Sequence, residues 1–318
     1  QQFDLLLNLN APSLASSIPD VAGSIHGRIK VAGDLTAPKV NADLVGENLA
    51  VGELSMAQLT LKGDVIASEQ PSGKLDLSIS QLTQPGVDIE SVQLTASGSA
   101  LAHQAQLVVV GSPLATELNI AGRWQQQAWQ GQLQQAWFET VEGRWQLDQP
   151  GQISYQNGQF GLAKQCWSSE PSLFCILPTK AGASGDAGLV IEHYELSRLQ
   201  QFLPELMKLT GAINSELSVN WRKGMKPTAS MDLTGKAVHL TFLGDDNQTH
   251  EIPITTLTLN AQLEETLAKL VLNLDAAQLG NADLDLTLQP YTDENILQGK
   301  LLYQGLNIKA FHYLLPDI

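Results

Sequence analysis

The side chains that most often carry chemistry are few in this chain. The two cysteines, Cys166 and Cys175, have Trp167 and Pro171 between them. In a reducing compartment they are free thiols, whereas in an oxidising compartment two cysteines that flank a turn form a bridge across it. A Cys-x2-Cys spacing and a nearby histidine are both absent, which argues against zinc. We therefore predict a Cys166–Cys175 disulfide and a periplasmic or extracellular location.

The 6 histidines are spread singly along the chain and form neither a His-Glu-x-x-His motif nor a pair four residues apart. They are His26, His103, His193, His239, His250 and His312. Because metal chemistry needs converging ligands, we interpret them as separate surface residues. The sequence predicts no metal site and no cofactor.

Two polar loops also lack what a chemical site would need. Residues 182–188 are glycine-rich, but the Gly-Lys-Ser/Thr ending of a phosphate loop is missing. Residues 244–247 carry two aspartates without the other ligands of a calcium loop, so both segments are interpreted as connections. There is no Gly-x-Ser-x-Gly elbow and no acid/base pair stands out, so the sequence favours a protein that is not an enzyme.

Charge and composition argue against further classes of function. The formal net charge is -15, which repels nucleic acid and anionic lipid surfaces. Hydrophobic residues make up 43% of the chain but aromatic residues only 6%, so aliphatic side chains are spread thinly and regularly. No run approaches the roughly 20 apolar residues of a transmembrane helix. The chain opens in a strand-like run at Phe3 and stops near Leu314, so we interpret it as a fragment of a longer protein.

The elements that must position these residues are β-strands. Apolar and polar residues alternate in short runs from one end of the chain to the other, and in a strand alternate side chains point to opposite faces. The aliphatic members of the clearest runs, each predicted to share one face, are Leu59, Leu61, Leu75, Leu77, Ile79, Leu118, Ile120, Leu217, Val219, Leu257, Leu259, Leu270, Leu272, Leu274, Leu284, Leu286 and Leu288. About 20 short strands fit the length, more than one ordinary sheet holds, so we predict an all-β, elongated, stacked-strand fold.

The chain also repeats at a coarser scale. Short helices that end at a proline are predicted near 13–19 and over 196–204, and a third copy begins at 306–318. After each of the first two copies a glycine, Gly23 or Gly211, opens the next strand. We predict one repeat segment over 1–195, with the disulfide loop 166–175, and a second over 196–318, with strands to 303.

Residues 123–167 are rich in tryptophan and glutamine. The tryptophans are Trp124, Trp129, Trp137, Trp145 and Trp167. A row of tryptophans can stack on sugars, although tryptophan in strands more often serves packing. Both interpretations stay open at this point.

Several segments, taken in order, resemble the TamB family and its AsmA-like relatives. They are Cys166-Trp167 followed by Leu173-Phe174-Cys175, Phe202-Leu203-Pro204, residues 209–214, residues 217–221 and the strands from Leu270 to Leu288. The resemblance implies an open, taco-shaped or half-pipe β-groove with an apolar interior and a few short helices. It also implies a periplasmic location, an anchor in the inner membrane of a Gram-negative bacterium, and an Omp85-type outer-membrane partner, TamA. The expected roles are phospholipid transport between the membranes and support of outer-membrane protein assembly.

In such a groove the aliphatic faces would be lipid-contacting, because each buried CH2 of an acyl chain is favoured by about 0.8 kcal/mol. The same leucines could instead pack against an opposing sheet as a closed core. Two functions from other classes also remain open. One is a chaperone or scaffold that pairs with unfolded outer-membrane proteins by strand augmentation without carrying lipid. The other is an extracellular β-helical enzyme or adhesin acting on polysaccharide.

Overall fold

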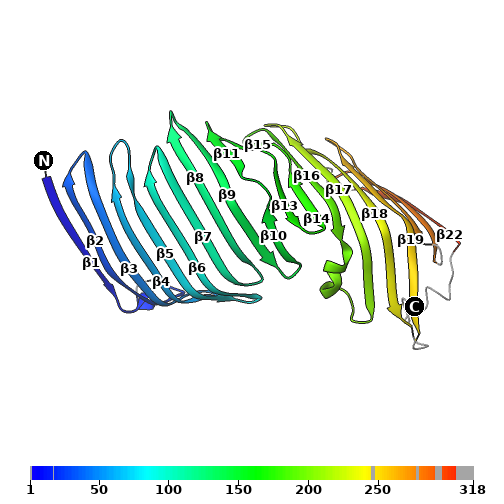
Figure 1. The fold of residues 1–318 in the computed structure, drawn as a ribbon, viewed down its shortest axis with the longest axis horizontal. Helices are drawn as coiled ribbons and strands as arrows, with labels where there is room; N and C mark the ends of the chain where they lie inside the picture. The colour runs from blue at the N-terminus through cyan, green and yellow to red at the C-terminus, as the bar shows by residue number, and fades with distance from the viewer. Residues whose placement is uncertain (1, 17, 245–247, 277–278, 291–295, 306–318) are drawn as a thin grey trace. The chain divides into compact units, whose positions relative to one another are not determined.

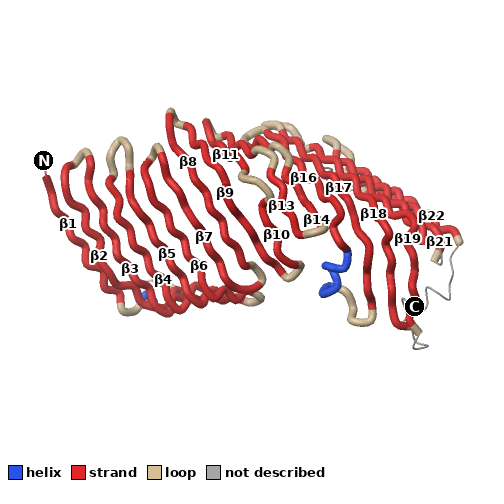
Figure 2. Tube along the Cα trace, viewed as in Figure 1, coloured by secondary structure: helices blue, strands red, loops and turns tan. Residues whose placement is uncertain are grey.

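The computed structural model describes residues 2–16, 18–244, 248–276, 279–290 and 296–305. These residues form a 22-stranded antiparallel arrangement with two short 3-10 helices. Figure 1 and Figure 2 show that strands dominate the chain. The predicted all-β, stacked-strand fold class is confirmed. The chain divides into two compact units, Gln1–Asn157 and Gly158–Ile318.

The first unit is a succession of long strands. Its strands are β1 (Gln2–Ala11), β2 (Val21–Asp34), β3 (Ala37–Val51), β4 (Leu54–Ile66), β5 (Ser72–Gln84), β6 (Val87–Ser99), β7 (Ala102–Ser112), β8 (Ala115–Gln125), β9 (Ala128–Thr140), β10 (Gly143–Leu147) and β11 (Gly151–Gln156). From β1 to β9 each strand pairs with the next one in the chain. One half of β9 pairs with β10 and the other half with β11.

The second unit begins with short strands and continues with long ones. Its strands are β12 (Gln159–Leu162), β13 (Gln165–Ser169), β14 (Ser172–Ile176), β15 (Thr179–Ala181), β16 (Gly185–Glu195), β17 (Met207–Trp221), β18 (Thr228–Leu243), β19 (Thr249–Leu263), β20 (Ala268–Ala276), β21 (Gly280–Leu288) and β22 (Leu297–Gln304). The hairpin β13–β14 and the short strand β15 both pair with β16. From β16 to β22 each strand pairs with the next.

The two helices lie where the sequence repeat predicts them, but they are shorter than predicted. They are η1 (Leu14–Ser16) and η2 (Leu196–Phe202), and the strand after each contains a glycine at positive φ. Gly23 in β2 has φ 105° and Gly211 in β17 has φ 99°. The third predicted copy, 306–318, lies outside the described residues. The boundary between the repeat segments at 195/196 stays a prediction. The two compact units are defined by contacts between residues, and such contacts do not test where a sequence repeat begins.

β-bulges interrupt the strand pairing in each unit. In the second unit the register shifts between Ile191 and Tyr194 in β16 and between Thr210 and Ala212 in β17. The next strand, β18, has a positive φ of 48° at Ala237. A bulge adds one residue and bends the strand. Figure 2 shows the strands of the first unit curling at the end where its own bulges lie.

The bulges also keep the apolar side chains on one face. In β18, Leu233 and Gly235 share a face by alternation, and after Ala237 the same face continues with Val238. A Cβ on Gly235 would lie 3.0 Å from Cγ2 of Val238, which places the two residues side by side. One inserted residue reverses the alternation of side chains along the strand. The apolar positions in the sequence therefore shift by one residue at the bulge, and the apolar side chains stay on the same face of the sheet.

Candidate functional site

The predicted aliphatic residues of the first unit lie on one face of its sheet. Leu61 in β4 is directly opposite Leu77 in β5, which is opposite Leu94 in β6. The row continues through Leu107 in β7 to Leu118 in β8. The neighbouring rows on this face hold Leu59 with Ile79, Leu75 with Ala96, and Ala105 with Ile120. We call this surface the first apolar face.

The second unit repeats the arrangement in its long strands. Leu259 in β19 is opposite Leu272 in β20, and Leu272 is opposite Leu284 in β21. The remaining predicted residues occupy adjacent rows of the same face: Leu217, Val219, Leu257, Leu270, Leu274, Leu286 and Leu288. We call this surface the second apolar face.

Every predicted lining residue is half-buried, neither fully exposed nor sealed from solvent. The fully buried apolar side chains of the described residues are a different set: Ile89, Ala136, Trp145, Leu147, Trp167, Cys175, Leu196, Ala212, Val238, Phe242, Ile252 and Ala276. A sandwich of two sheets would close leucines in its interior. The exposure therefore indicates that, among the described residues, no second layer seals either apolar face.

The sequence analysis overlooked other members of these faces. Leu94, Leu107 and Leu233 stand in the same rows as the predicted residues. Met231 is directly opposite Leu217. The alternation that would have identified them is present in the sequence, but the small residues Ala96, Ala105 and Gly235 at neighbouring positions of the same face weaken it.

The opposite face of the first unit is polar and carries charges of alternating sign. Arg28 in β2 is opposite Asp43 in β3, which is opposite Lys62 in β4, which is opposite Asp76 in β5. Opposite charges on directly facing residues favour this register, and a slip by one residue would place them among the leucines. Because the side chains are exposed, each pair contributes little to stability.

The predicted disulfide is confirmed. Cys166 is directly opposite Cys175 in the β13–β14 hairpin, and the two are bonded with a Cα–Cα distance of 4.0 Å. Trp167 stacks on Phe174 with ring centroids 6.2 Å apart. Arg198 of η2 donates to the hydroxyl of Ser169 at 2.9 Å and to its carbonyl at 2.6 Å. The hairpin is thus held both by the disulfide and by the helix that follows it.

The tryptophans of the glutamine-rich stretch mostly pack against other groups. Trp145 and Trp167 are buried, whereas Trp124 is 44% exposed. Arg144 lies over Trp137, with its guanidinium carbon 3.9 Å from the ring centroid. This cation covers one face of the Trp137 ring.

Trp137 also belongs to a hydrogen-bonded cluster around Glu117. The carboxylate of Glu117 accepts from Gln106 at 2.9 Å, from Asn119 at 3.1 Å and from the Trp137 indole at 3.2 Å. The Asn119 and Trp137 hydrogen bonds, with smaller contributions from Gln106 and the charge of Arg144, lower the pKa of Glu117. The cluster fixes an anion on the polar face and leaves it no proton to transfer near neutral pH.

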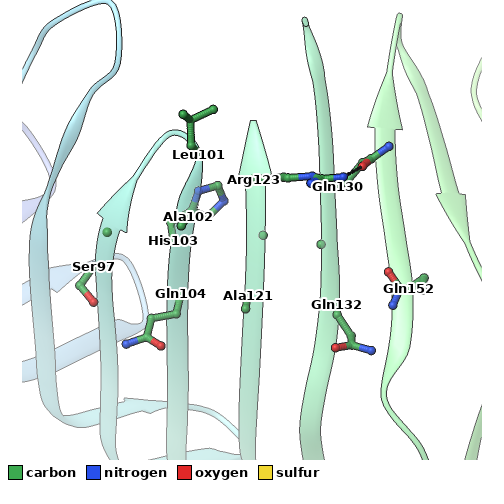
Figure 3. Close-up of a pocket in the computed structure, with 13 residues that line it drawn as sticks. Ser97, Leu101, Ala102, His103, Gln104, Ala121, Arg123, Gln130, Gln132 and Gln152 are labelled. Atoms are coloured by element: carbon green, nitrogen blue, oxygen red, sulfur yellow. Dashed lines mark hydrogen bonds between the residues drawn. The ribbon is translucent and has the colours of Figure 1, made fainter. Parts of the chain in front are cut away.

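Two hollows lie near the turn between β6 and β7 in the first unit, one on each face of its sheet. The polar hollow has a volume of about 650 Å³ and is drawn in Figure 3. The apolar hollow, of about 360 Å³, is lined mainly by small and aliphatic residues on the first apolar face, among them Val65, Leu75, Ala96 and Ala105. Ser97, Gly98, His103 and Gln104 line both hollows.

His103 and Trp129 form the polar end of the first apolar face. The indole N–H of Trp129 donates to Nε2 of His103 at 2.8 Å. Nδ1 of His103 lies 3.0 Å from the carbonyl oxygen of Ser99. Since an indole nitrogen only donates, Nε2 of His103 is the acceptor, and the pair fixes the orientation of the imidazole ring. The remaining histidines of the described residues do not join it.

Sequence comparison identifies the family. The model of the family described as TamB, N-terminal domain, matches residues 1–318. The chain is 28% identical over 323 residues to the translocation and assembly module subunit TamB of Haemophilus influenzae. That alignment covers 99% of this chain and 24% of the relative, so the chain spans about a quarter of the relative's length. No solved structure matches.

The described residues contain no helix with the length and hydropathy needed to cross a membrane. Within the same residues, no three His, Cys, Asp or Glu side chains converge in a way that could hold a metal ion. What the structure does provide is one apolar face per unit, each backed by a polar face. With the family match over its full length, this chain belongs to the TamB family.

Proposed function

We propose that the two apolar faces bind phospholipid acyl chains and form part of a route along which a longer periplasmic protein carries phospholipid between the inner and outer membranes. The observation that carries this proposal is the unbroken row of half-buried aliphatic residues from Leu61 to Leu118. An acyl chain laid on such a row gains about 0.8 kcal/mol for each CH2 that leaves water. The binding needs no charge, so it is compatible with the net charge of -15.

We further propose that the full-length protein, anchored in the inner membrane of a Gram-negative bacterium, works with the outer-membrane Omp85-type subunit TamA in the assembly of outer-membrane proteins. The support is the family membership and the name of the relative as a subunit of the translocation and assembly module. The oxidised Cys166–Cys175 pair suits a periplasmic location.

The alternative is a scaffold that captures unfolded strands by β-augmentation. Augmentation needs an unpaired strand edge. Strands β2 to β8 and β16 to β21 already pair on both sides, so their edges are occupied. In these strands the apolar faces, and not the edges, stay accessible, which favours lipid binding.

The experiment places a photo-crosslinking residue at Leu272 or at Leu77 of the full-length protein in cells and looks for attached phospholipid by mass spectrometry. Asn273 and Asp76 are matched controls, because each is the adjacent residue and points to the polar face. Adducts at the leucines alone support the conduit. Adducts at none of the four positions refute lipid binding and favour the scaffold.

A further inference from the structure

The polar hollow of the first unit is built around a row of direct cross-strand neighbours on the polar face. One residue comes from each of β6, β7, β8, β9 and β11: Ser97, Gln104, Ala121, Gln132 and Gln152. The short side chain of Ala121 leaves a gap in the middle of the row, and longer side chains stand around it (Figure 3). The volume of about 650 Å³ is within the range of roughly 300–1,000 Å³ that small-molecule sites have.

The three glutamine amides of this row have no hydrogen-bond partner among the residues that the structure describes. The flanking rows differ. On one side, Gln106 and Asn119 both donate to the carboxylate of Glu117. On the other side, Gln130 accepts from Arg123 at 2.8 Å. The middle row therefore keeps its amide donors and acceptors available for a ligand.

The hollow has a positive charge in a chain that is acidic. The chain has 33 acidic residues and 18 basic ones, yet none of the described residues that line the hollow is Asp or Glu. Arg123 follows Ala121 by two residues on the same strand and face, so its Cα is about 7 Å from the gap. Its hydrogen bond to Gln130 orients the guanidinium at the edge of the hollow (Figure 3). A guanidinium has five N–H donors, so others remain to bind one anionic group.

The row is long enough for an extended ligand. Neighbouring strands are about 4.8 Å apart, so a row across five strands spans about 19 Å. Several linked sugar rings have this length, and sugar hydroxyls donate and accept hydrogen bonds as the amides do. A polyphosphate or a nucleic acid would be repelled by the net charge of -15, and a single arginine would not offset this repulsion. The hollow therefore suits a sugar chain with sparse negative charge.

We propose that the polar hollow binds an acidic oligosaccharide, with its rings lying across β6 to β11 over the gap at Ala121 and one carboxylate on Arg123. The sugar hydroxyls bond to the glutamine amides of the row. The site binds the sugar without cleaving it, because glycoside hydrolysis uses a pair of carboxyl groups and the described lining residues supply none. The first apolar face is on the other side of the sheet, so sugar binding there does not depend on lipid binding.

The test titrates the full-length protein with two tetrasaccharides by saturation-transfer NMR. One alternates glucuronic acid with N-acetylglucosamine, and the other contains only N-acetylglucosamine. We expect Arg123→Gln to weaken binding of the acidic tetrasaccharide about tenfold, the loss typical of one hydrogen bond to a charged group, and to leave the weaker binding of the neutral one unchanged. Arg28→Gln is the matched control, because Arg28 lies on the polar face outside this hollow, and it should change neither.

A second pair of variants tests the gap. Ala121→Leu fills it and should abolish binding of both tetrasaccharides, whereas Ser78→Leu, on the polar face of β5 outside the hollow, should not. Thermal unfolding shows whether each variant keeps the fold, and Arg123→Gln still tests the site if Ala121→Leu unfolds.

Three results would overturn the proposal. The first is that neither tetrasaccharide binds to the wild type. The second is that folded Arg123→Gln binds the acidic tetrasaccharide as tightly as the wild type does, which would place the binding elsewhere. The third is that a peptide of alternating glycine and glutamate binds as tightly as the acidic tetrasaccharide with the same dependence on Arg123, which would assign the hollow to peptides. Phospholipid adducts at Leu77 are measured separately, so the sugar site and the proposed function fail independently.

Discussion

Replacing Leu77 with asparagine tests the first apolar face most directly. Leu77 stands between Leu61 and Leu94 in the cross-strand row and is half-buried. Asparagine is similar in shape but polar. Burying a whole leucine side chain is worth about 1.5–3 kcal/mol, so a half-buried one that contacts an acyl chain contributes about 1 kcal/mol. That loss corresponds to a roughly fivefold weaker occupancy of the face by lipid.

The assay places a photo-crosslinking residue at Leu94, directly opposite Leu77, in the full-length protein and measures phospholipid adducts with and without Leu77→Asn. The matched control is Asp76→Asn, whose side chain lies on the polar face opposite Lys62. Thermal unfolding of each variant shows whether the fold is retained. The reasoning is refuted if Leu77→Asn leaves the adduct yield unchanged, or if Asp76→Asn lowers it equally.

Three further predictions concern stability. Reducing the disulfide, or replacing Cys166 and Cys175 with serine, should lower the stability of the hairpin by about 2–3 kcal/mol, the value expected for a bridge with a sequence separation of 9. The loss should appear as faster amide hydrogen exchange in the hairpin. Unchanged exchange would contradict this prediction. Gly211→Ala should lower the free energy of unfolding, measured with denaturant, by about 3 kcal/mol, because a Cβ at φ 99° would collide with the partner strand. Gly224 has φ 78° and open space around it, so Gly224→Ala should cost about 1 kcal/mol. Equal losses in the two variants would refute the steric argument. Because folding lowers the pKa of Glu117, the ionised side chain stabilises the fold above the ordinary glutamate pKa, and this stabilisation is lost as the pH falls through the folded pKa. The difference in melting temperature between the wild type and Glu117→Gln should therefore shrink between pH 7 and pH 3. A difference that stays constant over this range would exclude the stabilisation by ionised Glu117.

The fold class and part of the residues of the apolar faces followed from local sequence, whereas Leu94, Leu107 and Leu233 were identified only through the strand register. Side-chain alternation is a property of the extended backbone, so Leu270, Leu272 and Leu274 must share a face whatever strand lies beside them. The disulfide could be predicted for a related reason. Two cysteines close in sequence around a turn are brought together by the hairpin itself.

Only the tertiary structure decided which strands are neighbours, where the bulges fall and how far each face is open. The Arg123–Gln130 hydrogen bond and the Trp129–His103 contact arise from the register of β7, β8 and β9, and register depends on contacts between residues far apart in the chain. The same holds for the open faces. Alternation places leucines on one side of a sheet, but whether a second layer covers them is determined by how the whole chain packs.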